Sequence, residues 1–111
     1  MIIDFLSMTE DAKPNFKGGE KEYNVKMFNT DGNKIMRGRL VPGASIGFHT
    51  HTEDQEVIYI LEGEGSLVDA EGNVLDKVLP GQATLCPKGE SHSLANRGDS
   101  DLLFFAVVTS V

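Results

Sequence analysis

The sequence predicts one all-β domain, a small sandwich or barrel of short strands. Its 111 residues leave room for a single core, because a second domain would need more chain. Twelve glycines and four prolines are spread along the chain, which indicates many tight turns and no linker. Turn signals such as Asp31-Gly32, Pro42-Gly43 and Pro80-Gly81 recur about every 8–12 residues, the spacing found in sandwiches and barrels.

Nine strand-like runs of apolar or alternating residues lie between these turns. They are Tyr23–Phe28, Lys34–Val41, Ser45–His49, Glu56–Glu62, Ser66–Asp69, Val74–Val78, Ala83–Cys86, Ser91–Ala95 and Leu102–Thr109. Ahead of them, we predict an N-terminal strand at Ile2–Leu6 and a polar loop at Thr9–Glu22. The pattern Ser7-x-x-Glu10 is shaped like a helix capping box, but Pro14 limits it to one helical turn at most.

Two of the predicted strands are apolar on both faces, Val57–Leu61 and Leu102–Val108. A sheet with one wet face alternates polar and apolar residues, so we expect a second subunit to cover the outer face. We therefore divide the chain into a dimer-forming N-terminal strand and loop (residues 1–22) and a barrel (residues 23–111), and predict a homodimer that packs or exchanges sheet edges. The alternative is that Ile2–Leu6 folds back over its own barrel.

Charge and composition exclude several classes of partner. Ten lysines and arginines oppose seventeen acidic residues, for a formal net charge of −7, and no basic cluster is present to bind nucleic acid or an anionic membrane. The single cysteine, Cys86, cannot form an internal disulfide. Residues 1–8 lack the basic region of a signal peptide, and no apolar run approaches the roughly 20 residues of a membrane span. We expect a soluble, cytoplasmic protein.

The three histidines are the residues that indicate chemistry. His49 and His51 are two positions apart, so on a strand they project from the same face. Glu56 follows on the next predicted strand, and His92 lies far downstream. A His-x-His pair alone is weak evidence for a metal, so the interpretation depends on the residues around it.

Those surrounding residues follow a longer pattern. It reads Gly43-x5-His49-x-His51-x4-Glu56-x6-Gly63, and further on Gly81-x5-Pro87-x-Gly89-x2-His92-x3-Asn96. This pattern resembles the two motifs of the cupin superfamily at every fixed position, and the resemblance spans about Arg37 to Val108. It implies a small antiparallel jelly-roll β-barrel, also called a double-stranded β-helix.

The resemblance also implies one divalent metal ion held inside the barrel by His49, His51, Glu56 and His92. Three imidazoles and a carboxylate suit Fe, Mn, Ni, Co, Cu or Zn, and contain too much nitrogen for a dedicated Ca or Mg site. If the ion is six-coordinate, two positions stay open for water, O₂ or a small molecule that chelates through two oxygens. Which of these metals is bound stays open.

The side chains around the metal decide which chemistry it can support. Strand parity places Ile58 and Ile60 on the face of Glu56, and Leu94 on the face of His92, so we expect a largely apolar wall. The candidates for a proton-carrying catalytic residue are Tyr59, Tyr23 and Glu53. We expect Tyr59 to face away from Glu56, the loop Thr52–Gln55 to be solvated, and Cys86 to pack in the core.

Two hypotheses about function follow, because this fold hosts both enzymes and binding modules. The first is a metal-dependent enzyme, an oxidoreductase of the oxygenase type or an isomerase or lyase, that acts on a small oxygen-chelating metabolite. The alternative is a non-catalytic, metal-dependent domain that binds a small molecule. The sequence names neither the substrate nor the reaction.

Overall fold

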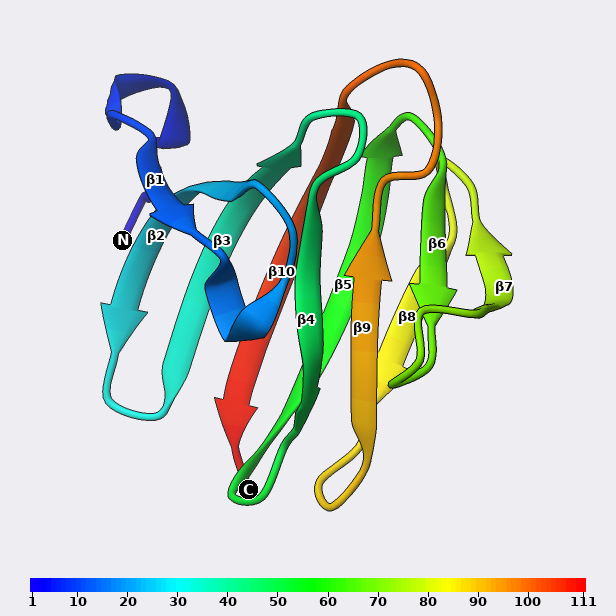
Figure 1. The fold of residues 1–111 in the computed structure, drawn as a ribbon. Helices are drawn as coiled ribbons and strands as arrows, with labels where there is room; N and C mark the ends of the chain where they lie inside the picture. Colours follow the sequence, from blue (N-terminus) through cyan, green and yellow to red (C-terminus); the bar gives the residue numbers. More distant parts are fainter.

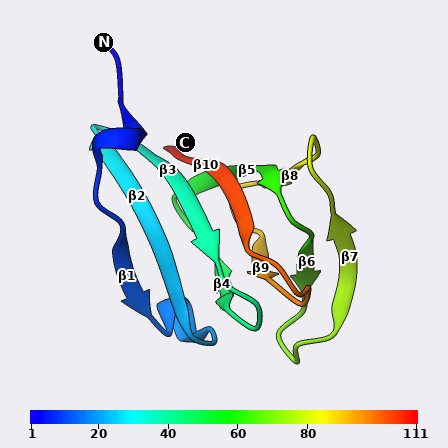
Figure 2. The ribbon, with the colours of Figure 1, turned by 90° about the horizontal axis from the view of Figure 1, so that it is seen from above.

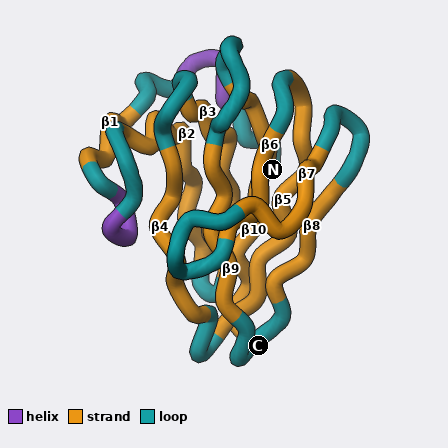
Figure 3. The backbone as a smooth tube through the Cα atoms, turned by 45° about the vertical axis from the view of Figure 1, so that its right-hand side comes forward, coloured by secondary structure: helices purple, strands orange, loops and turns teal.

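Two antiparallel sheets face each other across one apolar core (Figure 1). The computed structural model describes every residue from Met1 to Val111. The strands are β1 (Asp11–Pro14), β2 (Glu22–Thr30), β3 (Asn33–Leu40), β4 (Ser45–Thr50), β5 (Asp54–Glu62), β6 (Gly65–Val68), β7 (Val74–Val78), β8 (Ala83–Cys86), β9 (Ser91–Ala95) and β10 (Leu102–Ser110). Two short 3₁₀ helices, η1 (Phe5–Ser7) and η2 (Phe16–Gly18), are the only helical turns (Figure 3).

The strand order is that of a jelly roll. One sheet has the order β1-β2-β3-β10-β5-β8 and the other the order β4-β9-β6-β7. From β3 to β6 the chain changes sheet at each connection, and it does so again from β7 to β10, so neighbours in sequence face each other across the core (Figure 2). The predicted all-β, single-domain jelly roll is confirmed, and each of the nine predicted runs coincides with a strand.

The exposure of successive side chains alternates along several of these runs, as expected for strands with one face in the core. In β5, Ile58 and Ile60 are buried, while Val57, Tyr59 and Leu61 on the other face are 37–44% exposed. The inward residues of both sheets form one core, whose fully buried members include Leu40, Ile58, Ile60, Leu94, Leu102 and Phe104. Cys86 is also buried, as predicted.

The N-terminal predictions were wrong in detail. Ile2–Leu6 is not a strand, because residues 5–7 form η1. The residue that caps this helical turn is Asp4 and not Ser7, since the Asp4 carboxylate accepts the N–H of Leu6 at 3.1 Å. The predicted loop at 9–22 contains β1 and η2. Strand β1 is a four-residue strand at the edge of its sheet with mostly exposed side chains, so it lacks the longer run of large apolar residues that identifies a strand.

The outer face of the larger sheet is only partly covered. Phe5 packs edge-on against Phe105 of β10, with ring centroids 5.8 Å apart. Val57, Tyr59 and Leu85 stay exposed beside this contact. The N-terminal segment therefore folds back over part of its own sheet and leaves an apolar surface next to it. No helix in the structure has the length and apolarity needed to cross a membrane.

Candidate metal centre

Three strands bring four side chains with metal-ligand chemistry together. His49 on β4 and His92 on β9 are directly opposite each other in the antiparallel pair. A register shift between Ile46 and His49 interrupts the ladder just before this point, which is how a β-bulge re-aims a side chain. His51 follows the end of β4, and Glu56 points inward from β5 in the facing sheet.

The donor atoms of these four residues converge on one point. Their ligand atoms all lie within 4.8 Å of one another. Nε2 of His51 is 3.2 Å from Nε2 of His49 and 2.9 Å from Nε2 of His92. Oε1 of Glu56 is 3.0 Å from Nε2 of His92 and 3.3 Å from Nε2 of His51.

Hydrogen bonds on the far side of two rings orient the lone pairs inward. Nδ1–H of His49 donates to the carbonyl of Gly47 at 2.7 Å, and Nδ1–H of His51 donates to the Asp54 carboxylate at 2.5 Å. Both rings then present an unprotonated Nε2 to the cluster, which is the form that binds a metal. Burial lowers the pKa of His49, which also favours the neutral imidazole.

The cluster fits a transition-metal ion. At ligand bonds of about 2.1 Å, neighbouring donors lie roughly 3.0 Å apart around an octahedral ion and roughly 3.4 Å apart around a tetrahedral one. Four of the six separations between donor atoms are 2.9–3.3 Å, close to these values, and all six are within 4.8 Å. With His51 and Glu56 buried, four inward-facing acceptors would repel one another, and a bound cation removes that repulsion. The residues predicted as ligands are therefore together in a cluster able to hold a metal ion.

A cavity of about 260 Å³ opens beside the cluster and gives it access to solvent. His49, His51 and Glu56 lie in its wall, along with apolar side chains from several elements. These apolar residues are Phe16, Met27, Met36, Ile46 and Val108. Strand parity also predicted that the face of Met36, Gly38 and Leu40 lines the interior, and of these residues Met36 does line the cavity. The expectation was wrong for Ile58, Ile60 and Leu94, because these three side chains are sealed in the core.

The candidate proton carriers lie in different places. Tyr23 lines the cavity, and its hydroxyl donates to the sulfur of Met36 at 3.7 Å. Burial, with a further contribution from the Glu56 charge, raises the pKa of Tyr23, so this phenol stays protonated. Glu53 is also in the cavity wall, in the turn between β4 and β5. Tyr59 faces outward on β5, 44% exposed, and does not reach the site.

Comparison with known proteins places this architecture in a family. Residues 36–108 match the sequence profile described as Cupin domain. The chain is a cupin. It is 32% identical to the oxalate-binding protein of Thermotoga maritima, over 97% of this chain and 93% of that protein. It is also 34% identical to a germin-like protein of Morus alba, over 71% of this chain and 39% of that protein.

The fold of this cupin also matches solved structures. A crystal structure of a predicted oxalate decarboxylase from Thermotoga maritima superposes with a TM-score of 0.89 at 31% identity, over the full length of both chains. The match includes the N-terminal segment, which lies outside the residues covered by the family profile.

Sequence reasoning missed two parts of the cupin site. Asp54 was expected to be solvated with its loop, yet its carboxylate holds the His51 ring. Its position three residues after His51 is the signal that could have indicated this contact. Phe16 and Lys17 of η2 line the cavity from a segment predicted to be loop, and no motif marks them.

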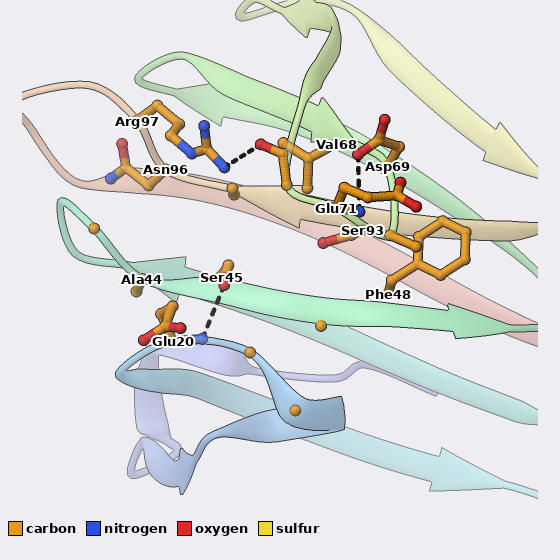
Figure 4. A pocket seen from close by; sticks show the side chains of 17 residues that line it. Glu20, Ala44, Ser45, Phe48, Val68, Asp69, Glu71, Ser93, Asn96 and Arg97 are labelled. Atoms are coloured by element: carbon orange, nitrogen blue, oxygen red, sulfur yellow. Dashed lines mark hydrogen bonds between the residues drawn. The ribbon is translucent and has the colours of Figure 1, made fainter.

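A second cavity, of about 290 Å³, lies away from the donor cluster (Figure 4). It is lined largely by glycines and by polar groups that already have partners. Arg97 donates to the carbonyl of Gly72 at 2.7 Å, and the Asp69 carboxylate accepts the N–H of Glu71 at 3.0 Å. Ser93 donates to the carbonyl of Ile46 at 2.6 Å. These three polar side chains already have hydrogen-bond partners, and none of the four donor residues lines this cavity, so it adds nothing to the candidate metal centre.

Proposed function

We propose that this cupin binds one divalent transition-metal ion through His49, His51, Glu56 and His92, and uses it to bind a small dicarboxylate of the oxalate class. The observation that carries this proposal is the convergence of four donors, three of them in the wall of a small cavity that is also lined by two lysines, Lys17 and Lys34. When bound, the metal supplies Lewis acidity and open coordination positions for the two oxygens of a chelating ligand. The names given to the Thermotoga maritima protein and to the Thermotoga maritima structure support oxalate as the ligand to test first.

The size of the cavity favours a small ligand. Drug-sized ligands occupy pockets of about 300–1,000 Å³, whereas this cavity measures about 260 Å³. Oxalate is planar, and a chelate through one oxygen of each carboxylate leaves its other two oxygens pointing away from the metal. A cavity with a metal on one side and ammonium groups on another complements that distribution of charge.

The side chains in the cavity favour binding over turnover. Tyr23 is held as a neutral phenol by burial, which raises its pKa, so it is not a ready base. Asp54 is engaged with His51, and Glu56 belongs to the donor cluster. Glu53 is the remaining carboxylate in the wall and would have to carry any proton that an enzymatic reaction needs.

Calorimetry with a product assay tests this function. Metal-free protein and samples loaded separately with Fe(II), Mn(II), Co(II), Ni(II), Cu(II) and Zn(II) would be titrated with oxalate. We expect binding that requires metal, with oxalate recovered unchanged. Elemental analysis of the protein as purified would identify the preferred ion. Absence of oxalate binding with every metal would overturn the proposal, and formate or CO₂ released with one of them would show an enzyme instead.

We also propose that the chain forms a homodimer through the outer face of its larger sheet. Val57, Tyr59 and Leu85 are 42–60% exposed there, next to the Phe5–Phe105 contact. Met1, Ile2 and Leu6 are about nine-tenths exposed and can extend such an interface. Sedimentation should show a species of twice 12.1 kDa, less stable in a chain lacking residues 1–8. A single 12.1 kDa species at micromolar concentration would refute the dimer.

A further inference from the structure

Residues 15–21, which we call the strap, have an unusual backbone. Asn15, Lys17 and Lys21 all have φ between 49° and 55°, in the left-handed region that residues with a Cβ rarely adopt. These are the only non-glycine residues of the chain with positive φ. Such conformations cost energy, persist only where surrounding contacts enforce them, and concentrate at ligand-binding sites.

Close backbone contacts with β4 enforce the shape of the strap. A Cβ on Gly47 would lie 1.9 Å from the carbonyl oxygen of Lys17, and one on Gly19 would lie 2.1 Å from the carbonyl oxygen of Ser45. The N–H of Ser45 donates to the carbonyl of Glu20 at 3.0 Å, and the N–H of Glu20 donates to Oγ of Ser45 at 2.9 Å (Figure 4). The strap is therefore fixed to the strand that carries His49.

This attachment places two strap side chains in the wall of the 260 Å³ cavity beside the donor cluster. Phe16 packs against Tyr23, with ring centroids 5.4 Å apart, and forms part of the apolar wall. Lys17 is solvent-exposed at the same cavity, with its ammonium 5.6 Å from the centre of the Phe16 ring. Its charge is not neutralised by the protein: Lys17 forms no ion pair, although the chain carries seventeen acidic residues.

We propose that Lys17 is a specificity-determining residue, whose ammonium pairs with the carboxylate oxygens that a metal-chelating dianion turns away from the metal. This inference rests on the proposed function. The strap holds the backbone of Lys17 in place before the ligand arrives, so only its side chain needs ordering on binding. Lys34, which enters the same cavity from β3, also lacks an ion pair, and Glu53 is a negative group in the same wall.

The chemistry of the ligand predicts which molecules Lys17 selects. Oxalate that chelates through both carboxylates keeps two outward oxygens and a full second charge. Glycolate can chelate through its hydroxyl and one carboxylate oxygen, and keeps one outward oxygen and a single charge. Lys17 should therefore raise the affinity for oxalate more than that for glycolate, and this difference should shrink in high salt.

Calorimetry on Mn(II)-loaded protein tests the inference with four variants. Lys17→Gln removes the charge, Lys17→Arg keeps it, and Lys34→Gln tests the other lysine in the cavity. Lys77→Gln is the matched control, because it removes the same charge on β7, where Lys77 pairs with Glu64 outside the cavity. Mn(II) affinity and melting temperature would be measured for each variant to verify that the cluster and the fold are intact.

We expect Lys17→Gln to weaken oxalate binding about tenfold and glycolate binding by less than threefold, with the affinity for Mn(II) unchanged. Lys77→Gln should change neither affinity by more than twofold, and Lys17→Arg should retain most of the oxalate affinity. Equal oxalate affinities for Lys17→Gln and Lys77→Gln, or a loss confined to Lys34→Gln, would overturn the role of Lys17 while leaving the proposed function intact. Wild-type protein that does not bind oxalate would overturn both.

Discussion

The donor cluster and the cavity beside it are built by two regions that hold their residues in place by different means. On one side, β4 and β9 place His49 and His92 opposite each other through a hydrogen-bonded ladder, and β5 adds Glu56 from the facing sheet. On the other side, the strap is placed by glycine contacts and a few hydrogen bonds to β4. The two regions can therefore be changed separately. A change in the strap alters the cavity wall, while the donor cluster keeps its place because the sheets position it.

The largest expected effect comes from removing donors on the strand side. His49→Ala with His92→Ala leaves two of the four donors, so we expect the stoichiometric binding of a divalent ion to be lost. Metal should also no longer raise the melting temperature, since it stabilises the fold only by binding it. Thr50→Ala with Ser91→Ala is the matched control, one residue away on the same two strands. Metal binding that survives the histidine double substitution would contradict the assigned ligands.

The strand side is also the part of the fold that the sequence predicts well. In Val57–Leu61, strand parity correctly put Ile58 and Ile60 on the inward face with Glu56, although the two isoleucines are sealed in the core and do not line the cavity. Strand β1 escaped prediction because Asp11–Pro14 is only four residues long, is mostly exposed, and is defined by its pairing with β2. The sequence has no local pattern for such a strand.

The next largest effect should come from forcing the strap away from β4. Gly47→Ala places a methyl group against the backbone oxygen of Lys17, which cannot rotate away as a side chain would. We expect the free energy of unfolding to fall by about 3 kcal/mol, as in overpacked cores. Urea titration followed by fluorescence or circular dichroism would measure it, and oxalate affinity should fall in the same variant.

Gly18→Ala serves as the control for this substitution. Gly18 has a φ of 80°, but no atom lies within 4 Å of the point that a Cβ would occupy, so alanine there adds backbone strain without a collision. That strain should cost roughly 1 kcal/mol. Equal losses for the two variants would show that the contact between the strap and β4 contributes little.

The donor cluster and its supporting residues differ in how far the sequence predicts them. The motif spacing predicted that the four donors lie together, and the structure places them in one cluster. Asp54 lies in a polar turn, where a carboxylate that faces water and one that faces His51 have the same sequence signature. Lys17 reaches the cavity through contacts with residues about 30 positions away, such as Gly47, which no local pattern records.

Replacing Asp54 should give a smaller effect than removing donors. Without its carboxylate the His51 ring loses the hydrogen bond that fixes its tautomer and orientation. We expect Asp54→Ala to weaken metal binding about 10–100-fold while the fold is retained. Competition with a chromophoric chelator would measure the affinity. Glu53→Gln, in the adjacent position and without contact to a histidine, is the control, and equal affinities for the two variants would argue against the role of Asp54.

The smallest effect is expected where the N-terminal segment is tied to the barrel by charge. Arg39 of β3 makes two hydrogen bonds to Glu10, at 2.7 and 2.9 Å, and lies 3.4 Å from Asp101. The bond to Arg39 lowers the pKa of Glu10 below its usual 4.5. A carboxylate whose pKa is lower in the folded state stabilises that state above its unfolded pKa, and this stability is lost as the pH falls through the folded value.

Glu10→Gln should therefore cost about 0.5 kcal/mol of unfolding free energy at pH 7, because both side chains are about one-third exposed and solvent screens the pair. The difference from wild type should shrink as the pH falls through the lowered folded pKa of Glu10, because the residue then becomes protonated in both states. Urea titrations at pH 7 and pH 3 would measure it. Asp11→Asn is the control: its partner Lys13 is close by, but Asp11 is 69% exposed, so little change is expected at either pH. A Glu10→Gln variant whose deficit is the same at both pH values would show that the ion pair does not fasten this segment.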